Sequence, residues 1–99
     1  MRKYELALVL VANLGEEDKL SELGKIKEII ARFGGQITNV DDWGKRKLAY
    51  EIKKVQKYKE GFYYFIHFDA ATSVPAELES RLRITERVLR YLVISLEDK

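Results

Sequence analysis

The chain has 99 residues, of which 46% are hydrophobic and 34% are charged, and it contains no cysteine. This length allows one core, so we expect residues 1–99 to form a single domain. A disordered chain is excluded because apolar residues occur along the whole length. Disulfides, thiolate metal sites and cysteine nucleophiles are also excluded, which fits a cytoplasmic protein. No apolar run approaches the roughly twenty residues that span a bilayer, so we expect no membrane segment.

The first two predicted elements are a strand and an amphipathic helix. Residues 4–11 are β-favouring and apolar on both faces, as in a central strand. The acidic run 16–18 after Gly15 favours a helix N-terminus, and Gly34-Gly35 supplies a left-handed stop. Between them lies an apolar stripe with helical spacing, formed by Leu20, Leu23, Ile26, Ile30 and Phe33.

The second half of the chain predicts two further strands, a short helix and a last strand. Residues 36–53 are typical of a long strand bent at Gly44, and the polar segment 54–60 of a loop. The aromatic run 62–68 predicts a central strand. A short helix then begins with Thr72 or Ser73 as its cap, has Pro75 in its first turn and buries Val74, Leu78 and Leu82, and residues 88–96 form the last strand.

This order predicts an α+β fold of the ferredoxin-like split βαβ type (βαββαβ). In it, two right-handed crossovers place both helices on one face of a four-stranded antiparallel sheet. The opposite face keeps apolar side chains, and an open apolar face of this size marks a binding surface. We therefore predict partner-protein contacts for Val9, Val11, Tyr63, Phe65, Leu92 and Ile94, with the condition that a register shift of one residue would exchange the two faces.

Basic residues are concentrated in two segments, although the net charge is only +2. Residues 43–59 contain seven lysines and arginines against Glu51 alone, and residues 81–90 contain four arginines. The first segment has two interpretations, which its composition leaves open. Its cations bind RNA phosphates, with Trp43 or Tyr50 available to stack on bases, or they protect a solvated edge strand from aggregation.

The segment Trp-Gly-Lys-Arg-Lys-Leu-Ala-Tyr-Glu-Ile-Lys-Lys at 43–54 resembles the signature of the bacterial small-subunit ribosomal protein family S-six. The opening Met-Arg-Lys-Tyr-Glu, the glycine pair at 34–35 and the segment 83–92 match this family as well, so the resemblance covers the whole chain. Glu51 departs from the pattern, because the family commonly has proline there.

The resemblance implies a structural protein of the ribosome, not an enzyme, that needs no cofactor. It implies binding to the central domain of small-subunit ribosomal RNA as a heterodimer with ribosomal protein S-eighteen, in support of platform assembly. Our candidates for RNA contact are Arg2, Lys3, Arg46, Lys47, Lys53 and Lys54. Arg87 and Arg90 are candidates for contact with either RNA or the partner protein. We interpret Trp43 as a packing residue at the strand bend.

Three alternatives follow from the same fold. An RNA-recognition motif would stack single-stranded RNA on Tyr63 and Phe65, but Glu60 and Tyr63 depart from its signature. A small phosphate-ester hydrolase would need a cation in the first strand-to-helix loop, and residues 11–15 contain none. No catalytic, metal-binding or phosphate-loop motif is present, and His67, the sole histidine, is expected to be packed or partner-facing. The third alternative is a homo-oligomer of the isolated protein through the open sheet face.

Overall fold

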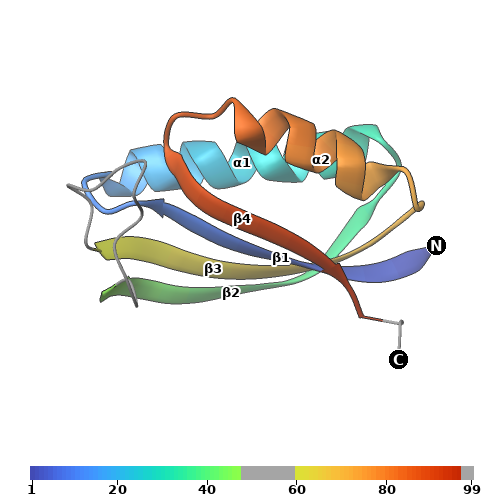
Figure 1. Ribbon diagram of the computed structural model, residues 1–99, viewed down its shortest axis with the longest axis horizontal. Coiled ribbons are helices and arrows are strands. Elements are labelled where there is room, and N and C mark those ends of the chain that lie inside the picture. The colour runs from blue at the N-terminus through green and yellow to red at the C-terminus, as the bar shows by residue number, and fades with distance from the viewer. Residues whose placement is uncertain (48–59, 97–99) are drawn as a thin grey trace.

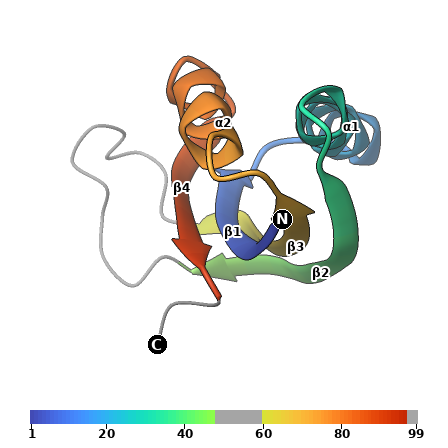
Figure 2. The same ribbon diagram turned by 90° about the vertical axis from the view of Figure 1, so that its right-hand side faces the viewer.

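The computed structural model describes residues 1–47 and 60–96. Its elements are β1 (Arg2–Val11), α1 (Glu16–Arg32), β2 (Gln36–Lys47), β3 (Glu60–Ala70), α2 (Val74–Arg83) and β4 (Val88–Ser95). The strands form a four-stranded antiparallel sheet in the order β2-β3-β1-β4. Both helices lie on the same face of this sheet (Figures 1 and 2). The predicted ferredoxin-like split βαβ fold is confirmed.

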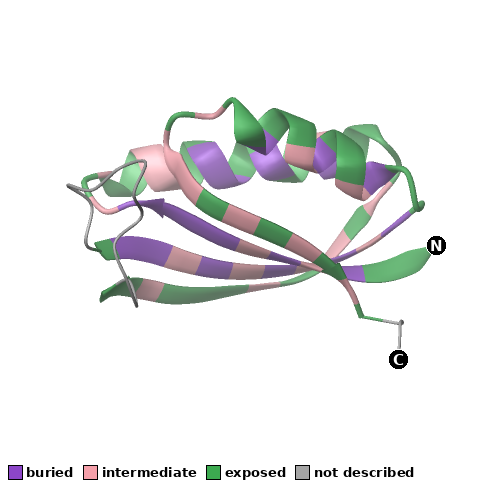
Figure 3. Cartoon of the chain, in the orientation of Figure 1, coloured by how far each residue is buried: buried purple, intermediate pink, exposed green. Residues whose placement is uncertain are grey.

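The hydrophobic core lies between the helices and the sheet. The two central strands provide most of it, and Figure 3 shows their buried positions. β3 alternates strictly, with buried residues toward the helices and half-buried ones between them from Tyr63 to Asp69. The helix-facing strand residues are Tyr4, Leu6, Leu8, Leu10, Phe62, Tyr64, Ile66, Phe68 and Ala70. The predicted helix positions Val74, Leu78 and Leu82 are buried against them.

Helix α1 differs from its predicted stripe at both ends. Leu20 and Phe33 are exposed, whereas the three central residues of the stripe are buried as predicted. Lys19 faces the sheet in place of Leu20: its Nζ lies 4.2 Å from the centre of the Phe62 ring and 2.7 Å from Glu16 Oε1. Because successive helical residues are turned by about 100°, Leu20 points away from the sheet once Lys19 faces it. The alkyl stem of a lysine can cover apolar surface while its ammonium keeps a polar partner.

The ends of the helices follow the predicted signals with one exception. Gly34 has φ +84°, as a left-handed stop after α1 requires. Pro75 lies in the first turn of α2, and Ser73 occupies the N-cap position. However, the Ser73 side chain makes no capping hydrogen bond, because its backbone is helical (φ −81°, ψ −17°) and not extended.

The bend predicted at Gly44 coincides with a β-bulge. The register of β2 against β3 shifts between Asp42 and Gly44, and Gly44 has φ +75°, a conformation that side chains with a Cβ resist. The backbone N–H of Gly44 donates a hydrogen bond of 2.8 Å to Asp42 Oδ1. The predicted continuation of this strand over 48–53 and the loop at 54–59 lie outside the described residues. Glu60 belongs to β3 and not to a loop, because it pairs with Lys47.

Candidate partner and RNA interface

The open face, meaning the side of the sheet opposite the helices, carries side chains in rows that cross all four strands. Directly paired residues of antiparallel strands point to the same side, so the register defines each row. From β2 to β4, the rows are Gly44, Tyr63, Val9, Arg90; then Asp41, Phe65, Ala7, Leu92; then Asn39, His67, Glu5, Ile94. The structure thus places all six predicted partner residues outside the helix-covered core, with Val11 opposite Gly61 beyond the first row.

These six residues differ in accessibility. Leu92 and Ile94 are 59% and 42% exposed, and the two aromatic residues of β3 are half-buried. In contrast, Val9 and Val11 are only 7% and 5% exposed. The prediction that both valines contact a partner protein is therefore corrected, because other parts of the chain already cover their side chains.

Two backbone features explain the buried valines. The side chain of Val9 lies over Gly61 so closely that a Cβ on this glycine would collide with Val9 Cγ1. The N–H of Val11 donates a hydrogen bond of 2.9 Å to the carbonyl of Arg87, which holds the segment before β4 against the end of β1. The available apolar surface consequently lies toward the other end of β4.

Trp43 belongs to the open face, which sequence reasoning missed. Its ring packs on Phe65 with centroids 4.8 Å apart and planes at 58°, so the predicted packing role is confirmed. Nevertheless the indole remains 51% exposed. Arg46 lies beside it: the guanidinium carbon is 5.5 Å from the ring centre, and Nε donates a hydrogen bond of 3.0 Å to the Trp43 carbonyl. Counting alternate residues along β2 from Asp41 would have predicted that Trp43 lies on the open face.

The middle of the open face contains a polar pair. His67 Nε2 lies 2.9 Å from Glu5 Oε2, and both side chains are partly exposed. The two residues are direct neighbours across β3 and β1, and Ile94 follows Glu5 in the same row. A partner that covers this row must accommodate a hydrogen-bonded pair as well as apolar side chains. His67 therefore faces the predicted partner side.

The predicted RNA-contact residues are distributed over both sides of the sheet. Lys3, Arg46 and Arg90 belong to the open face, because they pair with Asp69, Gly61 and Val9. Arg2 and Lys47 pair with Ala70 and Glu60, and alternation directs them to the helix side. All five side chains are exposed. Lys53 and Lys54 lie outside the described residues.

Arg87 has a structural role that the sequence did not show. Its Nη1 lies 3.2 Å from Glu22 Oε2 and 3.5 Å from Asp18 Oδ1, both on α1. Glu22 is 4% exposed, and a buried carboxylate without a cationic partner is costly. Arg87 thus joins the start of β4 to α1, which favours a structural role for it over contact with RNA or the partner.

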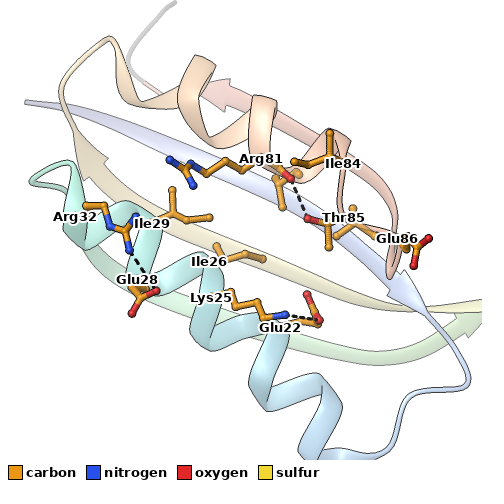
Figure 4. A pocket seen from close by; sticks show the side chains of 12 residues that line it. Glu22, Lys25, Ile26, Glu28, Ile29, Arg32, Arg81, Ile84, Thr85 and Glu86 are labelled. Atoms are coloured by element: carbon orange, nitrogen blue, oxygen red, sulfur yellow. Dashed lines mark hydrogen bonds and ion pairs between the residues drawn. The ribbon is translucent and has the colours of Figure 1, made fainter.

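The helix side carries a groove of about 590 Å³ between α1 and the end of α2 (Figure 4). Charged side chains at its rim pair within α1: Lys25 Nζ lies 3.4 Å from Glu22 Oε2, and Arg32 Nη2 lies 3.7 Å from Glu28 Oε1.

Within residues 1–47 and 60–96, no group of three or more His, Asp or Glu side chains is arranged to hold a metal ion. No helix in these ranges is long and apolar enough to cross a membrane.

An uncovered sheet face with exposed apolar and cationic side chains is typical of a domain that binds other macromolecules. The family model described as Ribosomal protein S6 matches residues 3–95. The small ribosomal subunit protein bS6 of Caldanaerobacter subterraneus subsp. tengcongensis is 47% identical over 98 residues, which are 99% of this chain and all of the relative. The protein of the same name from Clostridium botulinum is 46% identical over 97 residues, 98% of this chain and again all of the relative.

The solved structures agree with this result. The crystal structure of 30S ribosomal protein S6 from Thermotoga maritima matches with a TM-score of 0.86 and 34% identity, over 95% of this chain and 86% of that one. The chain belongs to the ribosomal protein S6 family, and the resemblance to S-six is confirmed. It is accordingly a structural protein of the small ribosomal subunit in the cytoplasm and not an enzyme.

Proposed function

We propose that the chain binds the central domain of small-subunit ribosomal RNA together with ribosomal protein S-eighteen and thereby supports assembly of the subunit platform. The observation that carries this proposal is the open face, on which exposed Leu92 and Ile94 continue into half-buried Phe65 and Tyr63. The names of the relatives support the small-subunit setting. The RNA domain and the partner come from the sequence resemblance.

The partner protein covers the rows that contain Leu92 and Ile94. These side chains lie in adjacent rows, beside Ala7 and Glu5 of β1, so they form one continuous patch with Phe65. Burying exposed apolar surface releases about 25 cal/mol per Å², which is the main favourable contribution that this patch offers. Val9 and Val11 support the patch from within the chain and do not touch the partner.

RNA contacts come from cations around the apolar patch. Arg46 and Arg90 occupy one end of the open face and Lys3 the other, while Arg2 and Lys47 extend the positive charge around the sheet edges. Lys53 and Lys54 stay candidates from the sequence resemblance alone. Each phosphate contact releases counterions, so binding by these residues weakens as salt concentration rises.

A filter-binding titration tests the RNA part of the proposal. The ligand is a fragment of small-subunit RNA that contains the central domain, with and without S-eighteen, at two salt concentrations. We expect tighter binding with the partner present, and a logarithm of affinity that falls with the logarithm of salt concentration by about 0.7 to 0.9 per phosphate contact. A salt slope near zero would overturn the assignment of phosphate contacts.

Sedimentation of variants tests the protein part. Leu92→Ser and Ile94→Ser are expected to weaken the complex with S-eighteen. Leu20→Ser is the matched control, because Leu20 is at least as exposed as either residue but lies on α1. A complex that tolerates both open-face substitutions contradicts the assigned surface. A tight homodimer of the pure protein that the partner cannot separate would favour the self-association alternative instead.

A further inference from the structure

We propose that Trp43 and Arg46 form a nucleotide-binding site, in which an RNA base outside a helix stacks on the indole and its phosphate contacts the guanidinium. The proposal rests on the proposed RNA-binding function and adds a binding mode to it. The indole is 51% exposed, although it is among the largest apolar side chains of the protein. Aromatic rings and arginine planes are the side chains on which single-stranded bases stack.

The indole is held in place before any ligand binds. Trp43 lies on the open face within the bulge between Asp42 and Gly44, and the hydrogen bond of 2.8 Å from the Gly44 N–H to Asp42 Oδ1 fixes this turn. Phe65, one strand inward, supports the ring at 4.8 Å between centroids. A ring held in this way loses little conformational freedom when it binds, which favours affinity.

Arg46 is positioned beside the ring. Its Nε–H is used in the hydrogen bond of 3.0 Å to the Trp43 carbonyl, which directs the guanidinium toward the indole at 5.5 Å. Within the described parts of the chain, no acidic side chain forms an ion pair with Arg46. The terminal nitrogens can therefore donate to a phosphate without breaking an ion pair there, and charge-assisted hydrogen bonds of this kind are strong.

Substitution of Asp41 distinguishes an RNA ligand from a basic protein ligand, because the two predict opposite changes in binding affinity. Asp41 shares a row with Phe65 on the open face, and Asn39 Nδ2 lies 3.1 Å from its Oδ1. Its negative charge repels a phosphate near Trp43 but attracts a basic residue of a protein. Asp41→Asn keeps the shape and one side-chain oxygen that can accept the hydrogen bond from Asn39. The substitution should therefore strengthen binding of RNA and weaken binding of a basic protein segment.

Trp43 is the sole tryptophan of the chain, so its fluorescence reports directly on this site. The probe is single-stranded oligoadenylate, added to the purified full chain without the partner. We expect saturable quenching of the emission. By anisotropy of labelled RNA, Trp43→Leu should weaken binding by about tenfold or more, as expected for the loss of a base stack. Arg46→Ala should weaken binding with a smaller salt slope, and Asp41→Asn should strengthen it.

A matched control lies on the helix side, where the Arg81 guanidinium is 5.9 Å from the ring centre of exposed Phe33. Phe33→Leu should leave RNA binding unchanged, and circular dichroism should show that both leucine variants fold. Absent quenching together with unchanged affinity of Trp43→Leu overturns the proposal. If central-domain RNA still binds with the partner in that case, the proposed function stands; if it does not, that function fails too. Weaker RNA binding by Asp41→Asn also overturns the nucleotide site.

Discussion

The two faces of the sheet arise from the same alternating pattern along the strands, but the side chains of one face are much more deeply buried than those of the other. Along β3, Tyr64, Ile66 and Phe68 are almost inaccessible under the helices, whereas Tyr63 and Phe65 between them remain half-buried. Both sets are apolar, so composition does not separate them. What separates them is that both helices of the chain cover one face and neither covers the other.

The open face itself has a covered end and an accessible end. Val9 and Val11 are buried near Gly61, while Leu92 and Ile94 are exposed two and four residues beyond Arg90. Apolar surface that the chain covers contributes to folding, whereas exposed surface contributes only when a partner binds. The comparison therefore predicts that substitutions on the two faces affect different measurements.

The largest expected contrast is between two isoleucines truncated in the same way. Ile66→Ala removes a fully buried side chain of the helix-covered face and should lower the free energy of unfolding by about 2–5 kcal/mol. Ile94→Ala, on the open face, should lower it by less than about 1 kcal/mol, because the side chain is already 42% exposed. Urea unfolding measures both. Similar losses would mean that the open face is part of the folding core.

Two glycines give the next contrast. Gly61→Ala should destabilise the protein by about 1–3 kcal/mol, because its Cβ would collide with Val9 and lie 3.0 Å from the Leu10 carbonyl oxygen. Gly24→Ala should stabilise it by about 1 kcal/mol, since this helical glycine has no atoms within 4 Å of an added Cβ. Thermal and urea unfolding check both values. If Gly61→Ala is neutral, the close contact does not cause the burial of Val9.

Sequence patterns predicted the fold and the two faces, because strand alternation and helix spacing are local properties. They failed where accessibility depends on a contact across the fold. Burial of Val9, for example, depends on a glycine of a neighbouring strand. Leu20 was misplaced because Lys19, a polar residue, took the sheet-facing position through its contact with Phe62.

The two arginines Arg87 and Arg90 show the same limit for the candidate site. They are three residues apart in one basic segment, so local charge gives them the same prediction. The acceptor of Arg87, however, is Glu22 on α1, 65 residues earlier in the chain. A pairing between elements so distant in sequence has no local signature. The RNA candidates at 53 and 54 stay predictions.

Arg87 and Arg46 are expected to affect different measurements, because Arg87 is paired with carboxylates of α1 whereas Arg46 lies beside the exposed ring of Trp43. Arg87→Ala should lower the free energy of unfolding by about 1–3 kcal/mol, because among residues 1–47 and 60–96 it leaves Glu22 with Lys25, at 3.4 Å, as its one cationic partner. It should leave the salt slope of RNA binding unchanged. Arg46→Ala should leave stability within about 0.5 kcal/mol and reduce that slope by about 1. A reversed pattern would favour Arg87 over Arg46 as the RNA contact.

The smallest expected effect is a pH dependence that originates on the helix-covered face. Burial raises the pKa of Tyr64, and the negative charge of Asp42 adds to this effect. The hydrogen bond from Lys19 to Glu16 raises the pKa of Lys19. Both groups hold their protons more tightly in the folded state than in the unfolded state. Their contribution to stability is therefore complete at neutral pH and is lost as the pH rises above about 10.

Tyr64→Phe separates the tyrosine from the lysine in this alkaline loss. The variant keeps the buried ring but cannot ionise, so its stability should decline less steeply above about pH 10 than that of the natural chain. Lys19→Met should reduce the decline as well, because it removes the other titrating group while keeping an apolar stem over Phe62. Urea unfolding at pH 7 and at high pH measures the difference. If stability declines in parallel with pH for all three proteins, other groups cause the alkaline loss. The helix-covered face then does not differ from the open face through the titration of Tyr64 and Lys19.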